Sequence, residues 1–382
     1  MRSLKHFAPV VLLLAVILAG CDNQPRTLPV IRLGYSPHDH HAALFMAAQL
    51  PDYFKEHGGI YLRETSFLKK YDLFESERLI ATVLIDSTIG GQEIIQKLSE
   101  DQYDLAFGGV PAIISFIDRG SSIKILMPVM ADGSELVVRN DLSAASWDEF
   151  VGYIKTTDQP VKIGFKTEFS VQNLIVEHAL RELGIPYSEK IDDPDARVIL
   201  VNLHGEKNLI PALTSKLIDG FVVNQPIPAI AEYEGAGKII SSLGELPPPG
   251  KWRGHPCCAL AGCEKFVKSE PAAVASFVAL MMRANQYITD HPGQSADLIA
   301  RWLELPVAIE EKSLPTIRFK TDFDEQWQQG IRFWVEALNQ AGQVQGAFKD
   351  IQPDTIPTLL YDRETFNAAR EKLSSHAPDN LK

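Results

Sequence analysis

Two groups of side chains that can bind metal ions stand far apart in the sequence. The first combines three imidazoles and one carboxylate within four residues: His38, Asp39, His40 and His41. The second is a pair of adjacent thiols, Cys257 and Cys258. Imidazole and thiolate together suit zinc, copper or a haem-type iron. Their spacing matches no standard zinc signature, but a fold that joins the groups would create one site. Its ligands would be His38, His40, His41, Cys257 and Cys258.

Other interpretations of these residues stay open. His40 or His41 could cap the helix that follows, and cysteines on strands often behave as small buried apolar residues. The same side chains could also contact an organic ligand. A disulfide between the adjacent cysteines is disfavoured, because consecutive Cα atoms about 3.8 Å apart fall below the usual bridging range of roughly 4.4–6.8 Å.

The elements that must position these residues alternate between strand and helix. Strands are predicted at residues 31–35, 82–85, 103–107, 161–165, 198–202 and 219–223. Helices are predicted at 44–57, 93–98, 171–183 and 209–217, with longer ones around 270–291, 294–303 and 325–341. Strands that end in Gly- or Ser-containing loops before helices indicate parallel βαβ units, whose ligands lie beyond the carboxyl ends of the strands.

Length and composition predict two soluble globular domains. The 382 residues exceed what one core usually serves, and 45% apolar with 23% charged residues is typical of a folded body. The net charge of −12, without a run rich in Lys and Arg, argues against a nucleic-acid partner. The cysteines at 257, 258 and 263 are odd in number and clustered, so no disulfide framework is expected.

The amino-terminal residues have the pattern of a bacterial lipoprotein signal. Arg2 and Lys5 precede an apolar run over residues 10–18, and Leu-Ala-Gly-Cys ends at Cys21. The run is too short to span a bilayer as a mature helix. We therefore expect lipid attachment at Cys21, with Asp22 resembling an inner-membrane retention signal. The alternative is an ordinary cleaved signal followed by a chance cysteine.

Two motifs carry a resemblance to a known group of proteins. They are DQYDLAFGG at 101–109 and LTSKLIDGFVV at 213–223, in an order of strands and helices that covers nearly all of residues 29–345. The sequence resembles the periplasmic solute-binding proteins of ABC importers, in the nitrate, sulfonate, taurine and thiamine-precursor group. The resemblance implies an α/β, two-lobed periplasmic binding protein fold of type II. Each lobe would be a sheet flanked by helices, with the ligand cleft between.

The resemblance also implies domain boundaries. Two crossing strands are expected near residues 135–139 and 255–260. The expected parts are a signal peptide at 1–20, a tether at 21–28, lobe one at 28–136 plus 258–345, lobe two at 137–257 and a C-terminal helical tail at 346–382.

Five loops would then face the cleft, at residues 36–41, 87–91, 108–111, 167–171 and 224–226. The implied ligand-binding residues are Ser36, His38, Asp39, His40, His41, Ser87, Gly90, Gly109, Thr167, Phe169, Ser170, Asn224, Gln225 and Cys257. Helix starts among these loops could receive an anion through free N–H groups. No loop carries a well-placed arginine and Asp39, Asp86 and Glu168 are negative, so an anion would rely on helix ends alone. The glycines could equally serve turn geometry.

The expected function is that of a non-catalytic, monomeric, lipid-anchored receptor at the periplasmic face of the inner membrane. It would capture a small polar solute of the nitrate, sulfonate, taurine or thiamine-precursor type for ABC permease and ATPase subunits. No cofactor is expected beyond a possible metal ion. The alternatives are a receptor or chaperone for a metal ion or metal chelate, an enzyme like the eukaryotic pyrimidine synthase that the thiamine-precursor branch resembles, and a sensory module. Fold alone does not decide among them.

Overall fold

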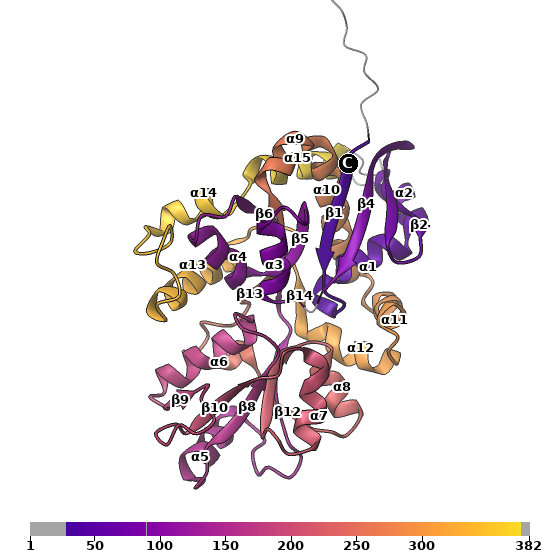
Figure 1. The fold of residues 1–382 in the computed structure, drawn as a ribbon. Coiled ribbons are helices and arrows are strands. Elements are labelled where there is room, and N and C mark those ends of the chain that lie inside the picture. Colours follow the sequence, from indigo (N-terminus) through magenta and orange to yellow (C-terminus); the bar gives the residue numbers. More distant parts are fainter. Residues whose placement is uncertain (1–27, 89, 376–382) are drawn as a thin grey trace, which may run out of the picture.

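The computed structural model describes residues 28–88 and 90–375. The predicted lipoprotein signal with Cys21 lies outside these residues. Within them, no helix combines the length and the apolar character needed to cross a membrane. The chain forms two α/β lobes that lie end to end, and Figure 1 shows the first lobe above the second.

The first lobe is built on an eight-stranded mixed sheet in the order β14-β6-β13-β5-β1-β4-β3-β2. Its strands are β1 (Val30–Tyr35), β2 (Ile60–Ser66), β3 (Lys70–Glu75), β4 (Arg78–Ser87), β5 (Leu105–Gly109), β6 (Ile123–Asp132), β13 (Pro256–Cys263) and β14 (Ile317–Phe319). β1 pairs in parallel with β4 and β5, whereas β13 is antiparallel to β5 and β6. The carboxyl ends of β1, β4 and β5 therefore meet at one edge, which faces the second lobe (Figure 1).

The second lobe has a six-stranded sheet in the order β12-β7-β11-β8-β10-β9. Its strands are β7 (Ser134–Val138), β8 (Val161–Phe165), β9 (Tyr187–Ser188), β10 (Val198–Asn202), β11 (Gly220–Asn224) and β12 (Lys238–Ser242). β8 lies between β10 and β11 and is parallel to both. The carboxyl ends of these central strands face the first lobe, so the ends of both sheets meet across one interface.

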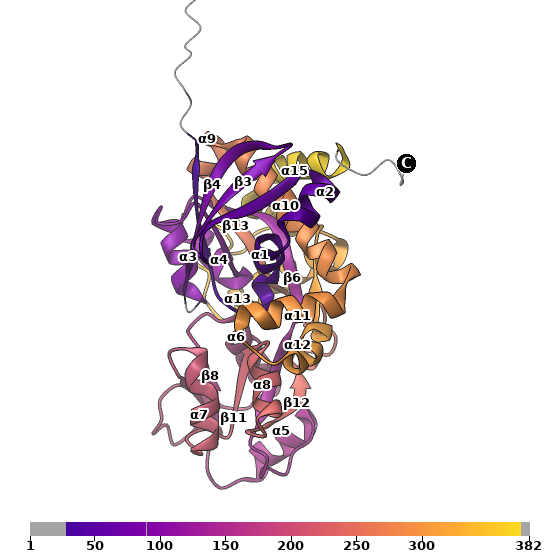
Figure 2. The same cartoon turned by 90° about the vertical axis from the view of Figure 1, so that its right-hand side faces the viewer.

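Helices cover both faces of the first sheet (Figure 2) and flank the second. The first lobe contains α1 (Ala42–Gln49), α2 (Pro51–Gly58), α3 (Gln92–Ser99), α4 (Val110–Asp118), α9 (Glu264–Ser269), α10 (Pro271–Asp290), α11 (Pro292–Leu303), α12 (Val307–Ser313), α13 (Glu325–Gln340), α14 (Ile356–Leu360) and α15 (Arg363–Ser375). The second contains α5 (Trp147–Thr156), α6 (Val171–Glu182), α7 (Leu209–Thr214) and α8 (Ile227–Tyr233). Ser146, Ser170 and Asp324 cap helices by accepting a hydrogen bond from the N–H three residues on.

Short 3₁₀ turns join several of these elements: η1 (Asp39–His41), η2 (Glu206–Asn208), η3 (Leu243–Glu245), η4 (Leu314–Thr316) and η5 (Pro353–Thr355). The two-lobed α/β architecture predicted from the sequence is confirmed. The hairpin of β2 and β3 was not predicted, nor was the insertion of β13 between β5 and β6.

The segment after residue 345, expected as a helical tail, packs into the first lobe. Phe348, Leu360 and Phe366 are buried, and α15 lies against α10. Tyr361 forms a parallel bridge to Ile125 of β6. The carboxylate of Asp118 accepts hydrogen bonds from the backbone N–H groups at the start of this segment. The segment after residue 345 is therefore part of the hydrophobic core of the first lobe and does not extend away from the lobe as a separate tail.

The chain changes sheets at a single residue, Gly133, which separates β6 from β7. It returns to the first sheet between β12 and β13. Both changes precede the expected crossings at 135–139 and 255–260, which fall largely inside β7 and β13. Residues 125–138 are all buried, although Asp132, Ser134 and Glu135 at the hinge are polar or charged. No change in burial therefore marks the boundary.

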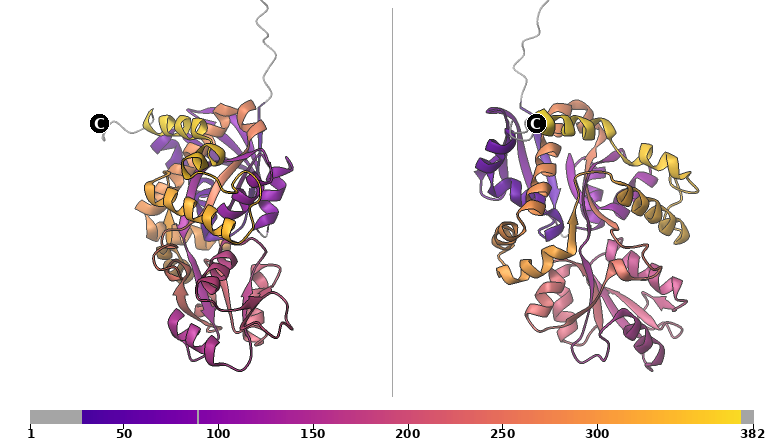
Figure 3. Two further views of the ribbon diagram at one scale, coloured as in Figure 1. Left: turned by 90° about the vertical axis from the view of Figure 1, so that its left-hand side faces the viewer. Right: turned by 180° about the vertical axis from the view of Figure 1, so that it is seen from behind.

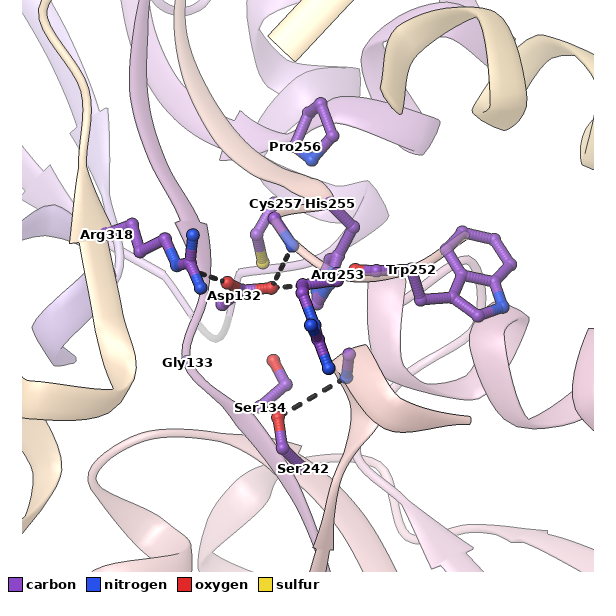
Figure 4. Close-up of polar contacts among 12 residues, drawn as sticks. Asp132, Gly133, Ser134, Ser242, Trp252, Arg253, His255, Pro256, Cys257 and Arg318 are labelled. Atoms are coloured by element: carbon purple, nitrogen blue, oxygen red, sulfur yellow. Dashed lines mark hydrogen bonds and ion pairs between the residues drawn. The ribbon is translucent and has the colours of Figure 1, made fainter. Parts of the chain in front are cut away.

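Asp132 joins the segments that meet at this hinge (Figure 4). Its Oδ1 accepts a hydrogen bond from the Gly254 N–H at 2.7 Å and lies 3.3 Å from His255 Nδ1. Its Oδ2 lies 2.9 Å from Arg318 Nε on β14. Burial alone would raise the pKa of Asp132, but hydrogen bonding by His255, with Gly254 and Arg318, holds it below the ordinary value.

The substitution Asp132→Asn should lower the free energy of unfolding by about 1–3 kcal/mol near pH 7, because charge-assisted contacts are lost. Asparagine tolerates the left-handed backbone at this position, where φ is 62°. The folded-state pKa lies below the ordinary 3.8. The stabilisation is therefore present above that ordinary pKa and is lost as the pH falls through the folded-state value. Chemical denaturation at pH 7 and pH 3 measures both effects.

The control is Asp141→Asn, which removes an exposed carboxylate that pairs with Arg139 and Lys216. Because exposed ion pairs contribute little, this change should leave the unfolding free energy nearly unaltered at pH 7. An equal loss in the control, or a loss for Asp132→Asn that is the same at both pH values, would contradict the role given to Asp132.

Candidate ligand cleft

A small cavity lies between the lobes, where the strand ends of the two sheets meet. Its volume is about 30 Å³, on a scale where one water molecule needs about 10–15 Å³. The first lobe contributes His38, His40, His41, Gly90, Gly91, Ile94, Phe107, Gly108, Gly109, Ala112, Cys257 and Cys258. The second contributes Lys166, Phe169, Ser170, Val171, Gln172 and Asn224. The small volume and the two-sided lining describe a narrow cleft between the lobes.

The loop after β1 folds back on itself through His41. The Ser36 N–H donates to His41 Nδ1 at 2.9 Å, and the His41 ring packs 5.2 Å from Phe107 and 4.3 Å from His38 between ring centroids. Burial lowers the pKa of His41 and lowers that of His38 well below its usual value. Both rings are therefore neutral near pH 7, and His41 stabilises the turn that leads into α1.

His40 connects the hinge to the cysteines. Its Nε2 lies 2.8 Å from the Gly133 carbonyl oxygen and donates to it, since a carbonyl can only accept. This assignment leaves Nδ1 facing both sulfurs, 3.4 Å from Cys257 Sγ and 3.8 Å from Cys258 Sγ. The sequence prediction that the two groups meet is thus realised for three side chains.

A β-bulge explains how one ring reaches two adjacent cysteines. Side chains of successive strand residues normally point to opposite faces. In β13 the pairing with β6 shifts between Pro256 and Cys258 and again between Cys258 and Ala259, and such bulges re-aim side chains. Hydrogen bonding by Cys257 lowers the pKa of the Cys258 thiol well below its usual value, whereas burial raises that of Cys257.

The sequence predicted a metal site with five ligands, and the structure brings three of them together. Among residues 28–88 and 90–375, ligand atoms of His40, Cys257 and Cys258 lie within 4.8 Å of one another. His41 Nδ1 is held by the Ser36 N–H, although the His41 ring also interacts with Cys258, and neither His41 nor His38 belongs to this group. Sequence proximity placed these two histidines with His40, but the turn aims the rings differently.

Two residues of the second lobe were missed. Lys166 is buried and donates from Nζ to Asn224 Oδ1 at 2.5 Å, with Glu206 Oε2 3.8 Å away. Gln172 donates from Nε2 to Ser134 Oγ at 2.8 Å and reaches to 3.9 Å from Cys257 Sγ. Lys166 stands one residue before the predicted loop, and a lysine at a strand end was the signal that could have found it.

The expected negative charge is absent from the lining. Asp39 accepts a hydrogen bond from Ser313 and faces Glu310 on α12 instead of the cavity. Burial raises the pKa of Asp39 to about 6, and burial together with Asp39 raises that of Glu310 to about 9. Asp86 accepts from the Tyr103 hydroxyl at 2.5 Å. Asp39 and Asp86, two of the carboxylates that argued against an anionic ligand, are thus hydrogen-bonded to residues outside the cavity lining.

Glu168 is exposed and lines a separate hollow at the cleft mouth. Several other predicted ligand residues lie outside the inner lining: Ser36, Asp39, Ser87, Thr167 and Gln225. Ser36 and Ser87 line one neighbouring hollow and Thr167 lines another. The sequence did not separate these residues from the inner lining, because strand ends mark a loop, whereas the side-chain directions within the loop depend on its turns.

Three helices begin at the cavity. α3 follows Gly91, α4 follows Gly109, and α6 is capped by Ser170. Their free N–H groups and dipoles favour negative charge, and buried Lys166 adds a cation. Gly91 also allows the lobes to approach, because a Cβ there would lie 2.4 Å from Thr167 Oγ1.

The segment 24–304 matches the model of the NMT1-like family. The chain belongs to this family. An uncharacterized protein of Methanocaldococcus jannaschii is 34% identical to this NMT1-like protein over 138 residues, which are 35% of this chain and 95% of the relative.

Two solved structures are similar in fold. The periplasmic nitrate-binding protein NrtA of Synechocystis superposes with a TM-score of 0.69 at 14% identity, covering 92% of each chain. A ligand-binding component of an ABC-type import system from Staphylococcus aureus, with zinc bound, gives 0.67 at 15% identity, covering 89% of this chain and 99% of that one. The predicted periplasmic binding protein fold is confirmed.

Gly91→Ala should keep the lobes apart, because the added Cβ meets Thr167 across the cleft. We expect nitrate or taurine, whichever binds the wild type, to bind at least ten-fold more weakly, and the ligand-induced fall in the radius of gyration to shrink. Isothermal titration and solution X-ray scattering provide the measurements.

The matched control is Gly205→Ala. Both glycines have backbone angles that other residues avoid, φ 64° and ψ −137° at Gly91 and φ 135° and ψ 146° at Gly205. A Cβ at Gly205, however, would meet nothing within 4 Å. Equal weakening in the two variants would assign the effect to backbone strain and would refute the contact between lobes.

Proposed function

We propose that this protein is the solute-binding component of an ABC importer. It captures a small polar solute between its lobes and delivers it to permease and ATPase subunits. The observation that carries this proposal is the narrow cavity at the strand ends of both sheets, since a ligand there would contact both lobes at once. The fold shared with the nitrate-binding protein of Synechocystis supports it, as does that protein's name, which gives it a binding role.

The lining favours a small anion. Buried Lys166 and the starts of α3, α4 and α6 supply positive potential, and the inner lining includes no carboxylate among the described residues. Of the solutes expected from the sequence, nitrate and the sulfonate group of compounds such as taurine suit this chemistry. Taurine and a thiamine-precursor pyrimidine are both larger than nitrate and would need the lobes to separate further, given the cavity of about 30 Å³.

We also propose that the protein acts as a monomer anchored by lipid at Cys21 on the periplasmic face of the inner membrane. The lipoprotein pattern that ends at Cys21 supports the anchor. The geometry of the first lobe is compatible with it. The carboxyl end of β1 points to the cleft, so its amino end lies at the opposite end of the lobe, as the views in Figure 3 show. A tether there leaves the cleft free.

Lys166→Met should weaken anion binding by roughly 10- to 100-fold, because a charge-assisted hydrogen bond contributes about 1.5–3 kcal/mol. Titration of the purified protein with nitrate, taurine and a pyrimidine precursor measures this. Lys155→Met, which removes an exposed lysine of the same lobe, should bind as the wild type does. Tightest binding of the pyrimidine, or undiminished anion binding by Lys166→Met, would overturn the anionic solute class.

Cys21→Ala should abolish labelling by a radioactive fatty acid and release the protein from the membrane fraction. Cys263→Ala, which changes a buried cysteine of the first lobe, should remain labelled and membrane-bound. Labelling that persists in Cys21→Ala would disprove the lipid anchor while leaving solute capture untouched.

A further inference from the structure

His40, Cys257 and Cys258 are already spaced as ligands of one metal ion. With metal–nitrogen and metal–sulfur bonds of about 2.0 and 2.3 Å, ligand angles of 109–120° place nitrogen and sulfur about 3.5–3.7 Å apart. The observed separations from His40 Nδ1 are 3.4 Å to Cys257 Sγ and 3.8 Å to Cys258 Sγ. These distances bracket the expected range.

The ring of His40 is also oriented as a metal ligand requires. Its Nε2–H donates to the Gly133 carbonyl oxygen at 2.8 Å, so the lone pair of Nδ1 points toward the thiols. Ligating histidines commonly have their second nitrogen fixed in this way. A bulge in β13 is needed to bring both sulfurs to this lone pair, although a regular strand would separate them.

We propose that these three side chains bind one Cu(I) ion at the inner end of the cleft. Two thiolates are soft ligands that suit Cu(I) or zinc, and imidazole suits copper and zinc as well, so the number of ligands decides between the two metals. All three residues are buried, and Cu(I) accepts three ligands without water. Zinc in structural sites takes four, and the described residues offer a group of three.

The surroundings suit the charge of the occupied site. Cu(I) with two thiolates and a neutral imidazole carries one net negative charge. Lys166 and the starts of α3, α4 and α6 line the same cavity, and they favour negative charge. From the second lobe, Gln172 Nε2 lies 3.9 Å from Cys257 Sγ, so both lobes adjoin the site. This proposal goes beyond solute capture and does not rest on it.

The test uses the soluble chain, kept reduced and stripped of metal, with Cu(I) alone as the probe. Competition with a chromophoric Cu(I) chelator should give one bound ion per chain, and X-ray absorption should give two sulfur ligands and one nitrogen ligand. The double variant Cys257→Ser/Cys258→Ser and the single variant His40→Gln should each weaken Cu(I) binding at least 100-fold. Cys263→Ser is the matched control, because Cys263 is buried nearby on β13 but contacts Asp101, and it should bind Cu(I) like the wild type.

Thermal unfolding without metal separates binding from folding. The serine variants, which change one atom per side chain, should unfold as a cooperative transition. Cu(I) should raise the midpoint of the wild type and of Cys263→Ser but not of the double variant. Unchanged Cu(I) affinity in the double variant, an equal loss in Cys263→Ser, or stoichiometric zinc binding without Cu(I) binding would each overturn the site. Anion titration of the same variants is read separately, so a failed copper test leaves solute capture standing.

Discussion

Removal of water from the facing strand ends is the constraint on which the rest of the structure depends. When the lobes close, polar groups of both sheets lose solvent, and each needs a partner. Lys166 donates a hydrogen bond to Asn224, Gln172 donates one to Ser134, and His40 donates one to the Gly133 carbonyl. The first two pairs lie within the second lobe, and the third joins the first lobe to the hinge residue, so each pair holds together elements that are remote in sequence.

Not every group is satisfied in this way. Four buried atoms at or beside the cleft have no hydrogen-bond partner among the described residues: Ser36 Oγ, His38 Nδ1, His41 Nε2 and Thr167 Oγ1. A buried polar group without a partner costs about 1–3 kcal/mol. The closed form therefore gains stability when a ligand supplies the missing partners, which is the differential affinity that a closure mechanism requires.

The sequence predicted the parts of the site that depend on local pattern. The strand at 198–202 has the predicted bounds, and the meeting of His40 with Cys257 follows from the positions of strand ends. Lys166 and Gln172 were missed because their roles depend on Asn224 and Ser134, which are remote in sequence and come near only when the second lobe folds. The bulge in β13 depends on pairing with β6, and the turn that directs Asp39 to Glu310 depends on α12. Such long-range partners leave no periodic signal.

The single residue between β6 and β7 has a mechanical consequence. Gly133 lies at φ 69°, and a Cβ there would lie 2.6 Å from Ile317 Cγ1 and 2.8 Å from His40 Nε2. Its carbonyl also fixes the His40 ring. Any rotation at this one residue that moves the lobes also moves the acceptor that orients the ring. Gly133 therefore belongs both to the hinge and to the inner wall of the cleft. Rotation of the lobes about Gly133 and reorientation of the His40 ring, which lines the cleft, are a single movement.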